Sequence, residues 1–339
     1  MVTAAPARPT GGPAGAPARP APGRAISALA PVRACLRTRS LYPFVLRWFA
    51  SIEPSRRGQT RVLDMPAGSG VLSAPLSAAG FDVAPADLFP EYLEGAEARH
   101  SGRGVVEAFE SETGVRLDAD IRGALFGDSD PKRVGTLRAA AADMEAPLPF
   151  ADGSFDVVLC VEGIEHVMDR HKTLRELRRA LRPGGRLLIT TPNLLSIRAR
   201  IAYALAGQRA LKSFIDEHTS VWGRSPDGTR TYHGHAFLIS YYQLRYSLHH
   251  CGLRIRALHR SNWSPSSVLL APLALFIWLG TVSAQRRAVR KFERLRREGA
   301  IPPDAEAPYR EMLRHVMSGA LLFNATLIVE AEAVRDSGA

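Results

Sequence analysis

Three acidic residues each follow a short apolar run in the first half of the 339-residue chain. Asp64 ends the run "RVLD", Asp87 ends "FDVAPAD", and Asp143 follows "LRAAAA". A carboxylate at the end of a strand can bind a cationic group, hold the two hydroxyls of a ribose, or accept a hydrogen bond from an adenine amino group. The three acids together favour an adenosine ligand with a cationic tail over a ligand that carries a pyrophosphate.

Alternating strands and helices would bring these acids to one place. The apolar pattern predicts strands at 61–65, 81–86, 136–142, 155–161 and 186–191, and helices at 69–79 and 171–181. The breaker cluster "PGG" at 183–185 ends the second of these helices. This alternation indicates an α/β fold, a parallel sheet with helices on both faces, whose ligands bind beyond the carboxyl ends of the strands.

Composition divides the chain into five expected parts. They are a disordered tail at 1–25, an N-terminal helical segment at 26–57, a main domain at 58–262, an apolar and then Arg-rich insertion at 263–308, and a last helix and strand at 309–339. An organelle transit peptide is the alternative for the Arg-rich tail. The main domain should end in a helix through Leu244 and Leu248 that stops at Gly252, before a further strand. The run "LLFNATLIVEA", at 321–331, should be the strand that closes the sheet.

The loop after the first predicted strand allows a ligand to approach the backbone closely. Gly68 and Gly70 lie in "DMPAGSG", and Asp87 follows Gly68 by 19 residues, a spacing that a nicotinamide dinucleotide site would share. That alternative requires a third glycine at position 73, where this chain has Ser73. The structural alternative is that Asp64 and Asp87 merely cap the helices that follow them.

Four motifs in order resemble the class I S-adenosylmethionine-dependent methyltransferases, and within them the methyltransferase type 11 or ubiquinone O-methyltransferase-like group. They are "VLDMPAGSG", "ADLF", "ADMEAPLPFADGSFDVVLCVEGIEHV" and "LRPGGRLLITTPN", and the resemblance covers about residues 58–193. It implies a Rossmann-like, seven-stranded, mostly parallel sheet with an antiparallel last strand and helices on both faces. Pro66 departs from the family pattern because it replaces the first Gly of the loop, so this position must need neither a positive φ nor an N–H donor.

The resemblance also assigns binding roles at the strand ends. Asp64 would hold the methionine end of S-adenosylmethionine together with the loop glycines, Asp87 would hold the ribose, and Asp143 with Met144 would hold the adenine. The complete cofactor-binding set that it implies is Asp64, Ala67, Gly68, Gly70, Asp87, Leu88, Asp143, Met144 and Glu162.

The end of the fourth predicted strand, "CVEGIEHVMD", holds the candidate catalytic group. Three interpretations stay open: His166 is a general base, the cluster only orders the loop or contacts the cofactor, or it ligates a divalent ion. Glu-x-x-Glu-His resembles the metal motif of small-RNA 3′-terminal 2′-O-methyltransferases and of ubiquinone-pathway O-methyltransferases, which add a downstream His. The implied ligands are Glu162, Glu165, His166 and His235, with His233 as a near alternative, and they suit Mg²⁺, Mn²⁺ or Zn²⁺.

The net charge of +11 is concentrated in two appendages. Residues 1–52 carry seven Arg and no acid, residues 284–298 carry seven basic and two acidic residues, and the remainder sums to −1. A neutral core argues against nucleic acid as the partner. The three cysteines, Cys35, Cys160 and Cys251, are too far apart for a metal or disulfide framework, which is typical of a cytoplasmic protein.

Residues 268–280, "VLLAPLALFIWLG", are uncharged and precede the Arg-rich part of the insertion. A helix of this length reaches about 20 Å, short of the about 30 Å of a bilayer core, and Pro272 interrupts it. The alternatives are a buried cover helix, an oligomer contact, or a peripheral anchor in which 268–297 contacts the inner face of the membrane.

These features together favour an enzyme, a methyltransferase that uses S-adenosylmethionine to methylate an oxygen of a small-molecule, lipid or glycan acceptor. Two alternatives stay open. One is an RNA ribose 2′-O-methyltransferase with a divalent metal, and the other is a catalytically idle cofactor-binding module at a membrane. The acceptor pocket is expected to form from inserts such as 91–133 and 194–235.

Overall fold

The computed structural model describes residues 41–93, 104–127, 135–209, 215, 220–224, 231–261, 264–303, 305 and 307–334. The predicted disordered tail at 1–25 lies outside these residues, as does 26–40 of the predicted N-terminal helical segment. The described part of that segment forms two helices, α2 (Leu41–Ala50) and α3 (Pro54–Arg57).

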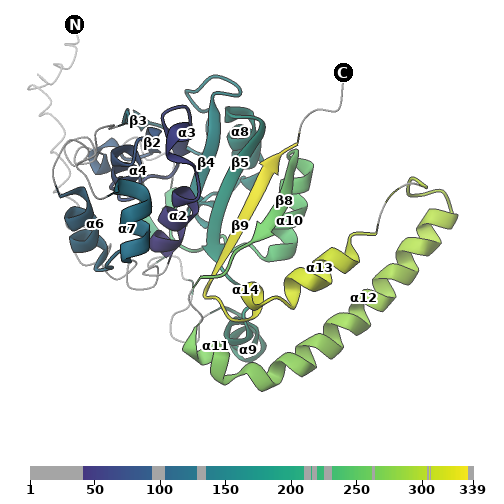
Figure 1. The fold of residues 1–339 in the computed structure, drawn as a ribbon. Helices are drawn as coiled ribbons and strands as arrows, with labels where there is room; N and C mark the ends of the chain where they lie inside the picture. The colour runs from purple at the N-terminus through teal and green to yellow at the C-terminus, as the bar shows by residue number, and fades with distance from the viewer. Residues whose placement is uncertain are drawn as a thin grey trace, which may run out of the picture.

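A seven-stranded sheet forms the centre of the molecule (Figure 1). Its strands are β1 (Arg61–Asp64), β2 (Asp82–Asp87), β3 (Ala140–Ala141), β4 (Phe155–Val161), β5 (Leu181–Pro192), β8 (Leu253–Leu258) and β9 (Thr326–Ala333). The spatial order is β3-β2-β1-β4-β5-β9-β8, in which only β9 runs antiparallel to its neighbours. This confirms the predicted Rossmann-like α/β sheet with an antiparallel last strand. A separate two-stranded ribbon pairs β6 (Val221–Arg224) with β7 (Thr231–His233).

Two apolar layers enclose the sheet. Helices α8 (Arg170–Ala180) and α10 (Tyr241–His250) pack on one face, and α2, α4 (Ser73–Ala78), α6 (Val105–Thr113) and α7 (Ala119–Phe126) pack on the other. Strand β5 shows the two-residue period of a sheet that is buried on both faces, since Leu187 and Ile189 join the first layer and Leu188 joins the second. The face of α8 that packs on the sheet is apolar, and its Leu174 and Leu177 are fully buried.

Several predicted boundaries are wrong for local reasons. Helix α4 begins at Ser73, four residues later than predicted, because the loop glycines have positive φ. The predicted third strand is reduced to β3 and an isolated bridge between Val83 and Leu137. The predicted closing strand starts five residues too early: 321–322 belong to α14 (Gly319–Leu322), whose N-cap Ser318 accepts from the Leu321 amide, and the strand begins at Thr326.

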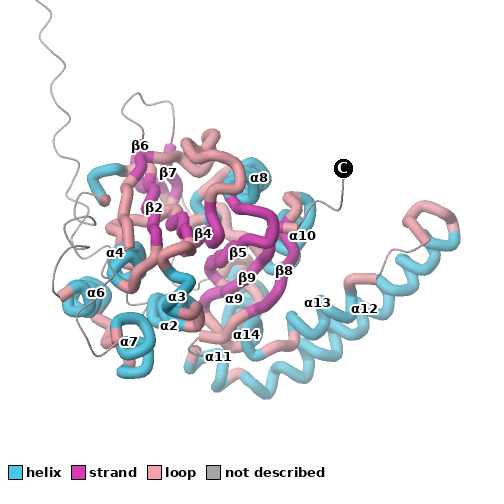
Figure 2. The backbone as a smooth tube through the Cα atoms, turned by 45° about the horizontal axis from the view of Figure 1, so that its top comes forward, coloured by secondary structure: helices cyan, strands magenta, loops and turns pink. Residues whose placement is uncertain are grey.

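The region between β8 and β9 forms a helical hairpin beside the sheet. It contains α11 (Pro265–Leu269), a short 3₁₀ turn (Ala271–Leu273), α12 (Ala274–Arg297) and α13 (Tyr309–Val316). Figures 1 and 2 show α12 lying alongside α13 and extending away from the body of the molecule. Helix α9 (Ile197–Ala206) lies near the base of this hairpin (Figure 1).

The apolar segment of the hairpin is exposed. No residue of α12 is buried, and Leu275, Phe276 and Leu279 have exposed fractions of 59%, 69% and 51%. Of the alternatives for 268–280, the buried cover helix is therefore wrong, because none of these residues is buried in this chain. Among the helices that the structure describes, none is long and apolar enough to cross a membrane.

Candidate active site

The first acid of the site ends β1 and is fully withdrawn from solvent. Asp64 is only 1% exposed, and its Oδ2 accepts a hydrogen bond from the Ser73 hydroxyl at 2.6 Å. Burial raises the pKa of Asp64 to about 7; the nearby charge of Asp87 adds to this rise, and the Ser73 hydrogen bond opposes it. Asp64 therefore changes charge near neutral pH, and it would be held ionised by a cation placed beside it.

The second acid joins the glycine turn to β2. Asp87 accepts from the Gly68 amide at 2.8 Å and from the Phe89 amide at 3.0 Å, and burial raises its pKa against these bonds. Gly68 and Gly70 have φ values of +54° and +73°, which side chains rarely adopt, so the turn requires glycine at both positions. Pro66 has no positive φ, in agreement with its place in the loop.

The remaining residues of the predicted cofactor set continue along the same edge of the sheet. Ala67 donates its amide to Ala86 at the end of β2, and Leu88 follows Asp87 directly. Asp143 and Met144 follow β3, the next strand outward, where the Asp143 carboxylate accepts from the Glu145 amide at 2.8 Å. The predicted acids thus lie at the carboxyl ends of three adjacent strands.

The end of β4 has an unusual backbone conformation. Glu162 has φ +50°, the one non-glycine residue with a positive φ in the described part of the chain. Its amide and its carboxylate both bond to Thr190 on β5, at 3.0 and 3.2 Å. Burial raises the pKa of Glu162 to about 7, and the positive charge of Arg209 lowers it. Gly163 follows, and a Cβ there would lie 2.3 Å from the Pro66 side chain, so the β4 end and the first loop are in close contact.

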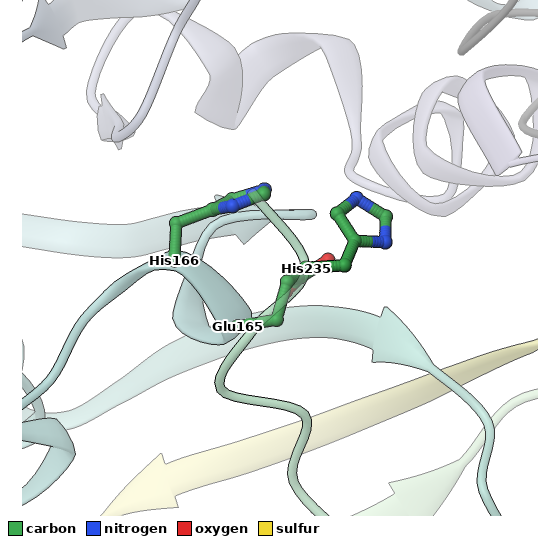
Figure 3. A group of neighbouring side chains, drawn as sticks. All are labelled: Glu165, His166 and His235. Carbon is green, nitrogen blue, oxygen red and sulfur yellow. The ribbon is translucent and has the colours of Figure 1, made fainter. Parts of the chain in front are cut away.

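Glu165, His166 and His235 form a cluster whose potential ligand atoms all lie within 4.8 Å of one another (Figure 3). Glu165 is fully buried, and neither of its carboxylate oxygens has a hydrogen-bond partner of ordinary geometry among the described residues. Burial raises the pKa of Glu165 well above its ordinary value, and the charge of Glu162 adds to the rise. Thr191 is close enough to oppose this rise in the pKa, although it makes no hydrogen bond of ordinary geometry with the carboxylate. A buried carboxylate beside two imidazoles is a site that a cation would stabilise.

His166 is held in one tautomer. Its Nδ1 lies 3.1 Å from the His233 carbonyl oxygen and 3.0 Å from the Gly234 carbonyl oxygen. Because both partners can only accept, Nδ1 carries the hydrogen and Nε2 carries the lone pair that a base or a metal ligand needs. Burial also lowers the pKa of His166, which favours the neutral imidazole.

The structure gathers three of the four predicted metal ligands. Glu162 does not belong to the group, and His233 contributes its carbonyl while its ring packs on Phe237. Sequence reasoning missed two residues that support the acids, Ser73 and Thr190. The role of Ser73 could have been suspected, because a hydroxyl stands where a dinucleotide site would have a glycine. The role of Thr190 could not, because Thr190 lies 28 residues along the chain from the carboxylate that it contacts.

Comparison with known proteins identifies the central part of the chain. The strand order of the sheet is that of a Rossmann-like α/β fold. Residues 63–189 match the family described as "Methyltransferase domain", so this part of the chain is similar to methyltransferase domains.

Two curated relatives match this region. A ubiquinone biosynthesis O-methyltransferase of Xanthomonas euvesicatoria pv. vesicatoria is 32% identical over 146 residues, which cover 43% of this chain and 47% of the relative. A demethylmenaquinone methyltransferase of Clavibacter sepedonicus is 32% identical over 166 residues, 48% of this chain and 55% of the relative. The chain thus spans about half the length of the curated relatives it matches.

Solved structures are more distant in sequence. A methyltransferase described as putative, in complex with the Trm112 activator of Haloferax volcanii, is 15% identical with a TM-score of 0.45, over 92% of this chain and 96% of that chain. A methyltransferase from Methanosarcina mazei is 14% identical with a TM-score of 0.43, over 81% and 93%.

The raised pKa of Asp64 predicts that ionisation of this buried carboxyl lowers the free energy of unfolding of the ligand-free protein. Because its folded-state value of about 7 lies above the ordinary 3.8, the free energy of unfolding of the ligand-free protein should fall as pH rises from about 4 to 7 and then level off. Asp64→Asn should raise this free energy by roughly 2–4 kcal/mol at pH 8 and change it little at pH 4.

Urea unfolding at pH 4, 6 and 8 measures this difference. Asp82→Asn, at the solvent-facing start of the neighbouring strand β2, is the matched control; it retains Asp64 and should keep the pH dependence of the wild type. An Asp64→Asn protein that is less stable than the wild type at pH 8 would contradict the assignment of a desolvated carboxyl.

Proposed function

We propose that the protein is an S-adenosylmethionine-dependent methyltransferase that transfers a methyl group to an oxygen of a small-molecule acceptor. The observation that carries this proposal is the bond from the Gly68 amide to Asp87, which joins the glycine turn to a strand-end acid next to the buried Asp64. The match to a methyltransferase domain supports methyl transfer, as do the two relatives, which are named as quinone-pathway methyltransferases, and the Xanthomonas relative is named as an O-methyltransferase.

Each strand end has a separate binding task in this proposal. Asp64 and the glycine turn bind the cationic methionine end, Asp87 with Leu88 binds the ribose hydroxyls, and Asp143 with Met144 binds the adenine. Ala67 and Glu162 complete the pocket from the first loop and the end of β4. When bound, S-adenosylmethionine supplies an activated methyl group on a sulfonium, so the protein has to orient the acceptor and exclude water.

His166 takes the proton of the acceptor hydroxyl in the simplest version of the reaction. Its Nε2 carries the lone pair, and its Nδ1 is fixed by two carbonyl oxygens, which is the arrangement of a positioned general base. The depressed pKa of His166 keeps the ring neutral and ready to accept a proton.

A divalent cation fits the same cluster. The unpartnered oxygens of Glu165 and the imidazoles of His166 and His235 would hold it, and the donor set of one carboxylate and two imidazoles suits Zn²⁺ or Mn²⁺. Such an ion would lower the pKa of a vicinal diol that it binds. In this version His166 is a metal ligand, and it no longer acts as the base.

We further propose that 268–297 contacts an anionic membrane surface, which would bring the enzyme to a lipid acceptor. The first turns of α12 expose large apolar side chains, and its second half carries Arg286, Arg287, Arg290 and further basic residues. Apolar burial and attraction to anionic lipid act together in such a helix. On this proposal the hairpin at 263–308 is an insertion into the methyltransferase domain that 309–334 completes.

Calorimetry with S-adenosylhomocysteine tests the cofactor site. The wild type should bind with micromolar affinity, and Asp87→Ala should weaken binding on the order of 100-fold, because it removes the ribose acceptor and the partner of the Gly68 amide. Asp82→Ala on the same strand should have wild-type affinity. A folded wild type that binds no S-adenosylhomocysteine would refute the enzyme, and binding without methyl transfer to any acceptor would favour an idle cofactor-binding module.

Metal titration and a chelator separate the two roles of His166. If the cluster holds an ion, Glu165→Gln and His235→Ala should each weaken Zn²⁺ or Mn²⁺ binding at least tenfold, and a chelator should stop methyl transfer to a 1,2-dihydroxybenzene acceptor. His233→Ala is the matched control, since its ring lies outside the cluster. Activity that survives the chelator but not His166→Ala would leave the general base as the correct role.

Vesicle sedimentation tests the membrane contact. Wild-type protein should pellet with phosphatidylglycerol vesicles and not with phosphatidylcholine vesicles, and Leu275→Ser together with Phe276→Ser should at least halve the bound fraction. Tyr246→Ser, which removes a side chain that is 61% exposed on α10, is the control. Equal binding by the double variant would show that α12 does not carry the contact.

A further inference from the structure

A groove of about 500 Å³ separates the hairpin from the helices beneath it. Helix α12 forms one wall, and α9, α10 and α13 contribute the others. Its lining residues are Arg200, Tyr242, Phe276, Ile277, Gly280, Thr281, Ala284, Gln285, Ala288, Tyr309, Met312 and Leu313. This volume falls in the range of small-molecule sites, about 300–1,000 Å³.

Small residues on α12 keep the groove open. Gly280 and Ala284 are one helical turn apart, and a Cβ built at Gly280 meets no atom within 4 Å. Most of the other lining side chains are apolar, and Phe276, which is 69% exposed, belongs both to the groove and to the exposed apolar face of α12. The groove therefore opens onto the face that we propose to contact a membrane.

Arg200 places a positive charge in this apolar surface, and none of the acids that the structure describes pairs with it. Its Nε donates to the Leu195 carbonyl oxygen at 2.8 Å, but its Nη2 is covered and donates to no group that the structure describes. No acidic side chain of the described residues forms an ion pair with it, and burial lowers the pKa of its guanidinium. A partly buried guanidinium without an acid is a binding feature for an anion.

A second cavity, of about 540 Å³, lies next to the groove, and Tyr242 lines both. Its lining begins at Met168, two residues after His166, and includes Arg170, whose guanidinium donates to the Phe237 carbonyl oxygen at 2.9 Å. The Phe237 amide in turn donates to the Glu165 carbonyl oxygen. Contacts among described residues thus connect the groove with the candidate catalytic cluster.

We propose that the groove binds an amphiphile with a single alkyl or isoprenoid chain and an anionic head, the chain lying along Gly280 and Ala284 and the head lying at Arg200. As a substrate class this rests on the proposed function, because the amphiphile would then be the methyl acceptor or the carrier of the acceptor. Binding of the amphiphile requires only the groove and the guanidinium of Arg200, so the two proposals can fail separately.

Titration calorimetry with dodecyl phosphate below its micellar concentration tests the proposal on the full-length chain. The wild type should bind it, and Arg200→Gln should weaken binding at least tenfold because the head loses its partner. Gly280→Leu should also weaken binding at least tenfold, because the new side chain fills the groove. Leucine has the higher helix propensity and its Cβ meets no neighbour, so unfolding of α12 would not explain the loss.

Matched controls come from the same chain. Arg198→Gln removes an exposed guanidinium from the same helix, and Gly123→Leu adds a side chain on α7, where a Cβ also meets no atom within 4 Å. Both variants should bind dodecyl phosphate as the wild type does. Equal affinities in all four variants, or no binding by the wild type, would overturn the proposal.

Two further ligands separate head from chain. Inorganic phosphate and dodecyl maltoside, which lacks the charge, should each bind at least tenfold more weakly than dodecyl phosphate. Phosphate that binds as tightly as the amphiphile, with no effect of Gly280→Leu, would refute a chain-binding groove. S-adenosylhomocysteine binding, measured on the same samples, reports on the cofactor site alone. A wild type that binds dodecyl phosphate but not S-adenosylhomocysteine would refute the methyltransferase function and support the amphiphile-binding groove.

Discussion

Four carboxyl groups are withdrawn from water at the carboxyl-terminal edge of the sheet, and the cost of desolvating them governs the site. Asp64, Asp87, Glu162 and Glu165 all have raised pKa values, and burial is the largest cause for each. Gathering negative groups in this way is unfavourable unless cations or hydrogen-bond donors compensate. A sulfonium, an ammonium and a divalent metal ion are all cations, so the ligands proposed for this edge are those that relieve its electrostatic cost.

Hydrogen bonds from small groups hold these acids in position. Ser73 satisfies Asp64, the Gly68 amide satisfies Asp87, and Thr190 satisfies Glu162. Glu165 differs, since its oxygens accept no hydrogen bond of ordinary geometry among the described residues, and it lies near the imidazoles of His166 and His235. Three of the four carboxyl groups are therefore supported by hydrogen bonds from the protein, whereas Glu165 is left with a pKa raised well above its ordinary value by burial.

Much of this arrangement could be predicted from the sequence, because the strand-end acids and the glycine turn depend on local pattern. The sequence predicts the strand Phe155–Val161 with its observed bounds, because a strongly apolar run of this length is typical of a buried strand. The start of β9 could not be predicted, because an apolar run suits a strand and a buried helical turn equally, and the cap from Ser318 decides between them. The hairpin face could not be predicted either, since exposure of Phe276 depends on tertiary contacts that composition does not report.

The chain leaves and re-enters the sheet at neighbouring points around the hairpin. His259, one residue past β8, donates its amide to Ile328 on β9, and the Ser264 amide bonds to Phe323 just before that strand. Because the two ends of the inserted segment are already joined, its length and content have little effect on closure of the fold. The hairpin can therefore change in length or content at little cost to the pairing of β8 with β9.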